Sequence, residues 1–362
     1  MLFEQKRNVQ YLFVKIRFSF IKENAMIKKS VTMSDIAKAL GVSTVTVSKA
    51  LGDKDGVGSE LRERIKQKAG EMGYQFSGTS KSVKENLTYS ISVIVAKHFI
   101  QDASAFYWVV YRYIVELLQK QNYYGILDVV SEEDETTCEI PKTVSEKKVD
   151  GVVVLGQISN AYVNALMSFD MPAVFLDFYS SRNDIDTVIA DNFFGSYLMT
   201  DYLISLGHRK IGFIGSIGST SSIQDRYLGY YKAHIENRIR LNQSWVIEDR
   251  RADGTSFSEF TLPQELPTAF VCNCDEAAYI LINQLRSRGL RIPDDISVVG
   301  YDNHIYSTIS NPRITTIDVN SYEMSHHAVD VLIKKIQDKS YHCGRVLVTG
   351  NLIERDSVKR LK

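Results

Sequence analysis

The sequence has few cysteines and no long hydrophobic run. Four cysteines, Cys138, Cys272, Cys274 and Cys343, are scattered over 362 residues. This is unlike the dense pattern of a disulfide-stapled secreted domain, and it suits a reducing compartment. Cys272 and Cys274 are one residue too close for the usual zinc spacing, and no second Cys/His pair follows them, so we expect no metal site. No apolar run is long enough to cross a bilayer, so we expect no membrane association.

The motifs of common enzyme classes are also missing. The sequence has no nucleophile elbow, no G-x-G-x-x-G fingerprint and no phosphate-binding loop. The stretch GFIGSIGSTSS (residues 212–222) is rich in Gly and Ser but has no P-loop lysine. We interpret it as a loop that lines a cleft. The sequence therefore favours a binding protein over an enzyme, and we expect no cofactor.

Net charge is zero overall but unevenly distributed. Residues 1–85 hold 16 Lys and Arg against 9 Asp and Glu, a balance of +7, so the remainder carries −7. A basic head on an acidic body indicates an anionic partner, most simply nucleic acid. The alternative is a basic tail, because residues 1–30 alone contribute +5. That segment has no signal-peptide cleavage pattern, and we interpret it as a disordered extension or a mis-assigned start, with Met26 as the alternative start.

The stretch MSDIAKALGVSTVTVSKALG (residues 33–52) predicts two short helices joined by a tight turn, because apolar residues recur at helical spacing in both halves. Gly41 falls where a helix C-cap needs a positive φ, and Ser43 falls where the next helix needs an N-cap. The segment SELRERIKQKAGEMGY (residues 59–74) would complete a small core. The spacing indicates a helix-turn-helix domain over residues 31–75, and the alternative is a helical hairpin of another kind.

The second of these helices would expose short hydroxyl and methyl groups and one cation, which can approach base edges and phosphates. The head resembles that of the LacI/GalR (lactose repressor) family of bacterial regulators. The resemblance implies that Thr44, Val45 and Lys49 read the major groove. It also implies that the phosphate backbone is held by the hydroxyl groups of Thr32, Ser43, Thr46 and Ser48.

The resemblance places a hinge at residues 76–88. It implies that Lys81 meets phosphates and that Val83 occupies the place of the usual minor-groove leucine. Valine is a smaller wedge, and β-branched residues weaken a short helix. We therefore expect a hinge that folds only on DNA and bends the DNA less.

Residues 89–362 alternate between apolar runs and amphipathic segments of helix length, which predicts parallel sheets with right-handed crossovers. The runs are SISVIVA, YGILDVV, DGVVVLG, PAVFLDF, KIGFIGS, TAFVCNC and DISVVGYD. SLGHRKIGFIG and RGLRIPDDISVVGYDN resemble the effector core of the same family, which is similar to periplasmic sugar-binding proteins. The resemblance implies a two-lobed α/β domain: lobe 1 is about 89–190 and 319–346, and lobe 2 is about 191–318 and 347–362.

Charged residues at predicted strand ends and helix starts suit a polyol, since carboxylates accept hydrogen bonds from hydroxyls and Arg donates a planar fork. Two aromatic residues can supply an apolar platform. The alternatives are an N-cap role for Asp275 and a surface ion pair for Arg226, which opens the segment DRYLGYYKA. The resemblance carries all six residues onto effector-contact positions: Phe106, Tyr107, Asp177, Arg226, Asp275 and Asp302.

Two positions depart from the family pattern. An Asn-Asp pair is replaced by Cys274-Asp275, and a frequent Gln is replaced by Val319. Both changes remove polar contacts, so we expect a drier site that favours a deoxy or aryl ligand.

The sequence thus predicts a cytoplasmic, nucleoid-associated transcriptional repressor. The resemblance implies a homodimer that would read a near-palindromic operator under the control of a small molecule, most simply a sugar or sugar derivative. The alternative is a solute-binding receptor without a DNA function, against which the intact head argues.

Overall fold

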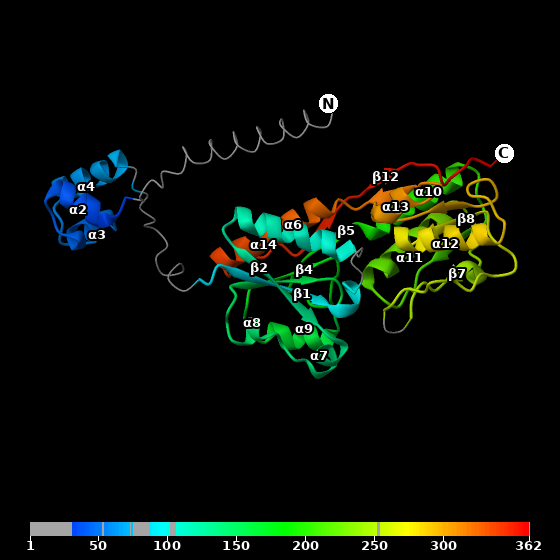
Figure 1. Cartoon of the computed structure of the whole chain (residues 1–362), viewed down its shortest axis with the longest axis horizontal. Coiled ribbons are helices and arrows are strands. Elements are labelled where there is room, and N and C mark those ends of the chain that lie inside the picture. Colours follow the sequence, from blue (N-terminus) through cyan, green and yellow to red (C-terminus); the bar gives the residue numbers. More distant parts are fainter. Residues whose placement is uncertain are drawn as a thin grey trace, which may run out of the picture. The chain divides into compact units, whose positions relative to one another are not determined.

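The computed structural model describes residues 31–52, 54–72, 74, 87–101, 106–251 and 254–361. The chain divides into two compact units, Met1–Asn86 and Leu87–Lys362, which we describe separately (Figure 1). The predictions for residues 1–30, and for Lys81 and Val83 in the hinge, lie outside the described residues. Within the described ranges, no helix is both long and apolar enough to cross a membrane.

The first unit is a three-helix head, as predicted. Its helices are α2 (Met33–Leu40), α3 (Thr44–Leu51) and α4 (Ser59–Glu71). Helix α2 ends at Gly41 with φ 66°, and the Ser43 side chain caps α3 by accepting a hydrogen bond from the Thr46 N–H at 3.0 Å. Both caps were predicted and are confirmed. The three helices share one small core of buried residues: Ile36, Ala37, Val47, Ala50, Leu51, Ile65 and Ala69.

The second unit contains two parallel sheets, so the predicted α/β class is confirmed. The six-stranded sheet has the order β11-β5-β4-β3-β1-β2, and the four-stranded sheet has the order β7-β6-β8-β9. The first sheet contains β1 (Ser90–Ala96), β2 (Tyr124–Val130), β3 (Gly151–Leu155), β4 (Ala173–Leu176), β5 (Asp186–Ala190) and β11 (Arg345–Val348). The second contains β6 (Ile211–Ile214), β7 (Val246–Ile247), β8 (Ala269–Cys272) and β9 (Ser297–Val299). Strands β10 (Thr316–Asp318) and β12 (Asn351–Ile353) form an antiparallel pair.

Helices cover both faces of the sheets. Figure 1 shows α6 and α14 on one face of the first sheet and α7, α8 and α9 on the other. The helices of the second unit are α6 (Phe106–Lys120), α7 (Glu132–Thr137), α8 (Lys142–Ser145), α9 (Asn160–Met167), α10 (Asn192–Ser205), α11 (Ser221–Glu236), α12 (Asp275–Ser287), α13 (Ile305–Ile309) and α14 (Ser321–Gln337). Short 3-10 turns lie at Lys97–Phe99 and Gln243–Trp245. Because strands such as β3 and β4 are buried on both faces, they read in the sequence as continuous apolar runs.

In the second unit, three connections run between the part that contains the six-stranded sheet and the part that contains the four-stranded sheet. They link β5 to α10, β10 to α14, and β11 to β12. Helix α10 packs on α11, and α14 packs on β4 and β5. The carboxyl ends of β4, β8 and β9 therefore belong to two different sheets, and the loops that follow them can form the walls of one site.

Helices α10 and α11 pack backbone to backbone at Gly229. A Cβ atom there would lie 2.0 Å from the Phe193 carbonyl oxygen and 2.9 Å from the Tyr197 nitrogen. We predict that Gly229→Ala lowers the free energy of unfolding by about 2–3 kcal/mol, since the two helix backbones must separate. Urea denaturation measures this loss. Gly218→Ala, where a Cβ meets nothing within 4 Å, is the matched control, and equal losses in the two variants would contradict the prediction.

Candidate functional site

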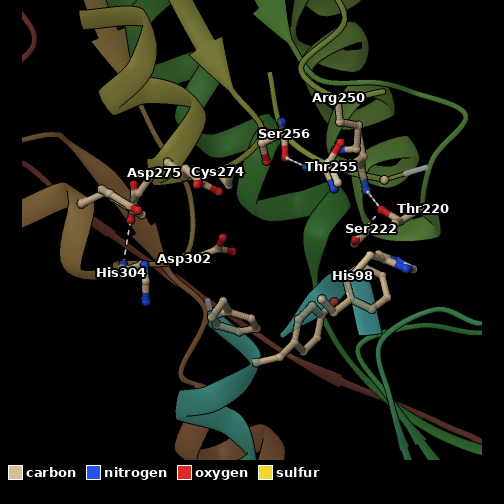
Figure 2. Close-up of a pocket in the computed structure, with 18 of the residues that line it drawn as sticks. His98, Thr220, Ser222, Arg250, Thr255, Ser256, Cys274, Asp275, Asp302 and His304 are labelled. Carbon is tan, nitrogen blue, oxygen red and sulfur yellow. Dashed lines mark hydrogen bonds between the residues drawn. The ribbon is translucent and has the colours of Figure 1, made fainter. Parts of the chain in front are cut away.

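A cavity of about 400 Å³ opens in the second unit, at the carboxyl ends of strands from both sheets (Figure 2). Its volume is in the range of small-molecule sites. The cavity is lined by all six predicted effector residues: Phe106, Tyr107, Asp177, Arg226, Asp275 and Asp302. The structure therefore brings together residues that are far apart in the chain, because parallel strands direct their carboxyl ends to a common edge.

Arg226 is a buried cation in the wall of the cavity. It lies in the second turn of α11 and does not open the helix, because α11 begins earlier, at Ser221, with Thr220 as its N-cap. The Arg226 residue is only 6% exposed. Its guanidinium carbon lies 3.9 Å from the centroid of the Tyr301 ring. A surface ion pair, the alternative considered for Arg226, is therefore wrong.

Each nitrogen of the Arg226 guanidinium has a different partner. The Nε atom donates to Asn192 Oδ1 at 2.8 Å, and Nη1 donates to the Asn273 carbonyl oxygen at 2.5 Å. The Nη2 atom donates to Asp302 Oδ1 at 3.1 Å. One buried cation thus fixes the start of α10 and the ends of β8 and β9 relative to one another, with a charge-assisted bond to Asp302.

Asp177 and Asp302 have unusual backbones and raised pKa values. Their φ angles are 68° and 99°, which non-glycine residues rarely adopt and which cluster at functional sites. Burial raises the pKa of Asp177 to about 6, against the opposing charge of Arg226. Burial also raises the pKa of Asp302, again opposed by Arg226. Tyr107 donates its phenolic hydrogen to Asp177 Oδ2 at 2.7 Å.

Asp275 lines the cavity, and its carboxylate also holds the turn that follows β9. The N-cap alternative for Asp275 is wrong, because Cys274 is the N-cap of α12 and its Sγ accepts a hydrogen bond from the Ala277 N–H at 3.5 Å. Asp275 Oδ2 accepts a hydrogen bond from the His304 N–H at 2.7 Å. Its Oδ1 lies where a Cβ on Gly300 would come within 2.1 Å. Asp275 therefore positions the turn that carries Asp302.

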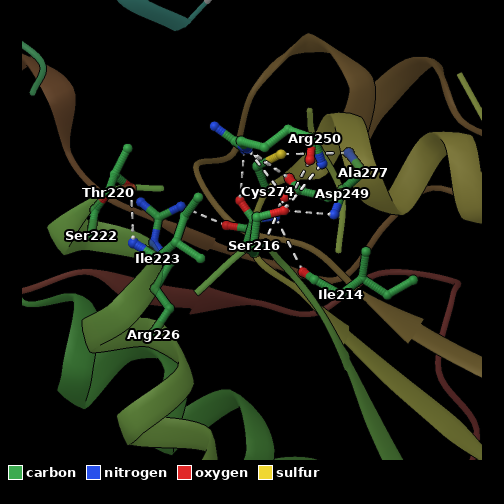
Figure 3. A network of polar contacts seen from close by, with 11 residues as sticks. Ile214, Ser216, Thr220, Ser222, Ile223, Arg226, Asp249, Arg250, Cys274 and Ala277 are labelled. Atoms are coloured by element: carbon green, nitrogen blue, oxygen red, sulfur yellow. Dashed lines mark hydrogen bonds and ion pairs between the residues drawn. The ribbon is translucent and has the colours of Figure 1, made fainter. Parts of the chain in front are cut away.

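The sequence analysis missed Arg250 and the network behind it (Figure 3). Arg250 lines the cavity, and its Nη2 donates to the buried Asp249 at 2.7 Å. Asp249 also accepts from Asn273 Nδ2 at 2.6 Å and from the Ser216 N–H at 2.8 Å. Burial opposes ionisation, but the hydrogen bonds from Arg250 and Asn273 lower the pKa of Asp249. No sequence signal marked this network, because β7, the strand before it, has only two residues.

The expected drier site is not found. Val319 packs into the core and is not among the described residues that line the cavity. Cys274 does line it, but so do polar residues from loops that were not considered, among them Thr220, Ser222, Arg250, Thr255, Ser256 and Asn273. The loop GFIGSIGSTSS lines the cavity through Thr220 and Ser222, as predicted.

Two hydrogen bonds join the walls of the cavity across the two sheets. The Ser221 N–H, at the start of α11, donates to Gln157 Oε1 at 2.7 Å. Tyr179, after β4, donates its hydroxyl hydrogen to Asp225 Oδ1 at 2.9 Å. Burial raises the pKa of Asp225, and the hydrogen bond from Tyr179 opposes this shift. The part that contains the six-stranded sheet is therefore in direct contact, beside the cavity, with the part that contains the four-stranded sheet.

The head carries the second set of predicted residues. A shallow depression is lined by Thr44, Val45, Ser48, Lys49 and Lys54. Val45 is 63% exposed, although it is apolar. The remaining residues lie at helix starts. Thr32 exchanges hydrogen bonds with Asp35 in a capping box at the start of α2, and the hydroxyls of Ser43 and Thr46 lie 2.8 Å apart at the start of α3. The exposed face of α3 thus presents small groups and a cation.

Comparisons with known proteins agree with the architecture of both the head and the second unit. The family model of bacterial regulatory proteins of the lacI family matches residues 32–77, and that of the periplasmic binding protein-like domain matches residues 200–358. The HTH-type transcriptional repressor PurR of Histophilus somni is 31% identical over 336 residues, covering 91% of this chain and 99% of that protein.

Solved structures share the fold. The complex of the transcriptional regulator CelR with cellobiose has a TM-score of 0.65 at 20% identity, over 90% of this chain and 99% of that one. The lac repressor dimer bound to operator and the anti-inducer ONPF has a TM-score of 0.61 at 22% identity, over 91% of this chain and 100% of that one.

The buried Asp177 carboxyl generates a stability prediction. Its pKa of about 6 in the folded protein exceeds the ordinary value of 3.8, so the folded state binds the proton more tightly, and the stability falls as pH rises from about 4 to 6. An asparagine side chain at this position does not titrate, and asparagine tolerates a positive φ. We therefore predict that Asp177→Asn raises the free energy of unfolding by up to about 3 kcal/mol at pH 8, with little change at pH 4.

Urea denaturation at the two pH values measures this difference. Asp170→Asn is the matched control, because Asp170 also has a positive φ, 47°, but is exposed. A gain of equal size at both pH values, or a loss at pH 8, would refute the prediction.

Proposed function

Because the chain belongs to the LacI family of bacterial regulatory proteins, we propose that it represses transcription from a near-palindromic operator under the control of a carbohydrate bound in the cavity. The chain is a sequence-specific DNA-binding regulator that responds to a small molecule, and its family consists of repressors and not of enzymes. The observation that carries the proposal is the presence, in one chain, of a helix α3 with an exposed polar face and a cavity built around Arg226.

The DNA is read by Thr44, Val45 and Lys49. Val45 offers an apolar side chain, 63% exposed, that suits the methyl group of thymine, and Lys49 offers a cation to guanine or to phosphate. Thr32, Ser43, Thr46 and Ser48 lie at the helix starts or beside Lys49, and they fix the head on the phosphate backbone. Lys81 and Val83 complete the interface from the hinge.

The carbohydrate lies between groups from both sheets. Asp177 follows β4 of one sheet, whereas Asp302 follows β9 of the other, and both line the cavity. These carboxylates accept hydrogen bonds from paired hydroxyls. The aromatic rings of Phe106 and Tyr107 offer faces to the apolar side of a sugar ring. Support for this class also comes from the fold relative CelR, whose structure holds cellobiose.

The position of the ligand explains how it controls the binding of DNA. A molecule that touches both walls binds most tightly when Asp177 and Asp302 are held at one separation, so it favours one arrangement of the two halves over others. In a homodimer, the favoured arrangement sets the spacing of the two heads and thus the affinity for the operator. The protein acts in the cytoplasm, where it associates with the nucleoid. The alternative, a solute receptor without a DNA function, leaves the lacI-family match over residues 32–77 without a role.

The proposal predicts a specific operator. The full-length protein, used to select duplexes from a random DNA pool at fixed salt, is expected to recover a palindrome of about 14–20 base pairs with half-sites near one helical turn apart. Lys49→Ala is expected to weaken binding about 10- to 100-fold and to relax the preference at one position of each half-site.

Lys38→Ala serves as the control, because Lys38 is exposed on α2 outside the depression on α3. Recovery of no palindrome, or equal effects of the two lysine variants, would argue against the proposal.

A further inference from the structure

The walls of the cavity hold more carboxylates than cations. Among the described lining residues, the acidic side chains are Asp177, Asp275, Glu276 and Asp302, and the arginines are Arg226 and Arg250. Both arginines already have a carboxylate partner. Arg226 pairs with Asp302 at 3.1 Å, and Arg250 pairs with Asp249 at 2.7 Å. Neither guanidinium therefore offers an uncompensated positive charge to a ligand.

The wall also contains two histidines, His98 and His304. Burial lowers the pKa of His304, against the opposing charge of Asp302, so its ring is neutral at physiological pH. His98 packs on Phe99, with ring centroids 4.1 Å apart. An anionic ligand would thus meet the carboxylate of Asp177 and two arginines that are already paired with carboxylates.

Asp177 has a hydrogen-bond partner but no ion pair within the described part of the chain. Its residue is 6% exposed, and the hydroxyl of Tyr107 donates to it at 2.7 Å. A buried carboxylate without a cation of its own is costly to keep ionised. A ligand that brought a positive charge to Asp177 would remove that cost on binding, and a neutral hydroxyl would remove less of it.

The surroundings of Asp177 also favour a cation. The Tyr107 ring lies 4.8 Å from the ring of Phe99 and 5.4 Å from that of Phe106, measured between centroids. All three rings line the cavity with Asp177. Aromatic faces attract a cation through their quadrupole, and this attraction strengthens when the cation is desolvated. One end of the cavity thus combines a buried carboxylate with aromatic rings.

We propose that the effector is an amine-bearing polyol, such as an amino sugar, whose ammonium group is bound by Asp177 among the rings of Phe99, Phe106 and Tyr107. Its hydroxyl groups face the polar wall around Arg226 and Asp302. The inference rests on the proposed function, which it narrows from carbohydrates in general to cationic ones. Sugar phosphates and sugar acids are excluded as effectors, because their negative charge would meet the carboxylate of Asp177.

Matched ligands test the inference directly. Isothermal titration of the full-length protein near neutral pH compares glucosamine, galactosamine and mannosamine with the parent hexose and the hexose monophosphate of each. At least one amine is expected to bind about tenfold or more tightly than its parent, a difference of about 1.4 kcal/mol. The corresponding phosphate is expected not to bind.

A variant assigns the preference to one carboxylate. Asp177→Asn keeps the shape of the side chain and removes its charge, so it is expected to lower the affinity for the amine at least tenfold and to abolish the preference over the parent sugar. Asp170→Asn, at an exposed residue that also has a positive φ, is expected to leave both affinities unchanged. Circular dichroism and operator binding of each variant report whether it is folded.

Three results would overturn the inference: a parent hexose that binds as tightly as its amine, a phosphate that binds more tightly than either, or no binding by any amine of the panel. Failure of the proposed function is separate. If the protein recovers a palindromic operator but binds only parent sugars, the proposed function stands and the amine inference is wrong. If it recovers no operator, the proposed function is wrong, whichever ligand binds.

Discussion

The buried guanidinium of Arg226 is the constraint on which the cavity depends. A cation removed from water must be compensated by partners at short distance, and Arg226 finds them on Asn192, Asn273 and Asp302. These partners come from three separate elements, so none of the three can shift without loss of a bond to the cation. Tyr301 stacks beneath the guanidinium, and its hydroxyl oxygen lies where a Cβ on Gly195 would come within 2.2 Å. The absence of a side chain at Gly229 lets α10 and α11 approach closely, and its absence at Gly195 leaves room for Tyr301.

The same cavity keeps groups that reduce stability. Asp177 and Asp302 combine positive φ angles with pKa values that burial raises, and Asp275 Oδ1 has no hydrogen-bond partner among the described residues. Each feature destabilises the folded chain, and each belongs to a residue that lines the cavity. The charge of Arg226 compensates part of this cost, and under the proposed function a bound ligand would compensate more. This division between an internal partner and a ligand explains how a small molecule changes the balance between conformations.

Local signals made much of the structure predictable. Gly41 and Ser43 terminate and start helices through their own backbone and side chain, so the head followed from a short stretch of sequence. Strand-end residues such as Asp177 and Asp302 followed from topology, since parallel strands converge at one edge. Arg250 was missed because its strand is too short to produce a pattern and its importance depends on Asp249 and Asn273. The cap of α12 was unpredictable for a related reason: Cys274 takes an N-cap role that Asn, Asp, Ser or Thr usually has, and Asp275 holds the turn at His304.

A double-mutant cycle on Arg226 and Asp302, followed by urea denaturation, tests the central claim that this buried pair organises the cavity. Arg226→Met leaves a buried carboxylate without its partner, and Asp302→Asn leaves a buried cation without its counter-charge. We expect the double variant to be more stable than the sum of the two losses predicts, with a coupling free energy of about 2–3 kcal/mol. A coupling free energy near zero would contradict the account, because Arg226 and Asp302 would then contribute independently.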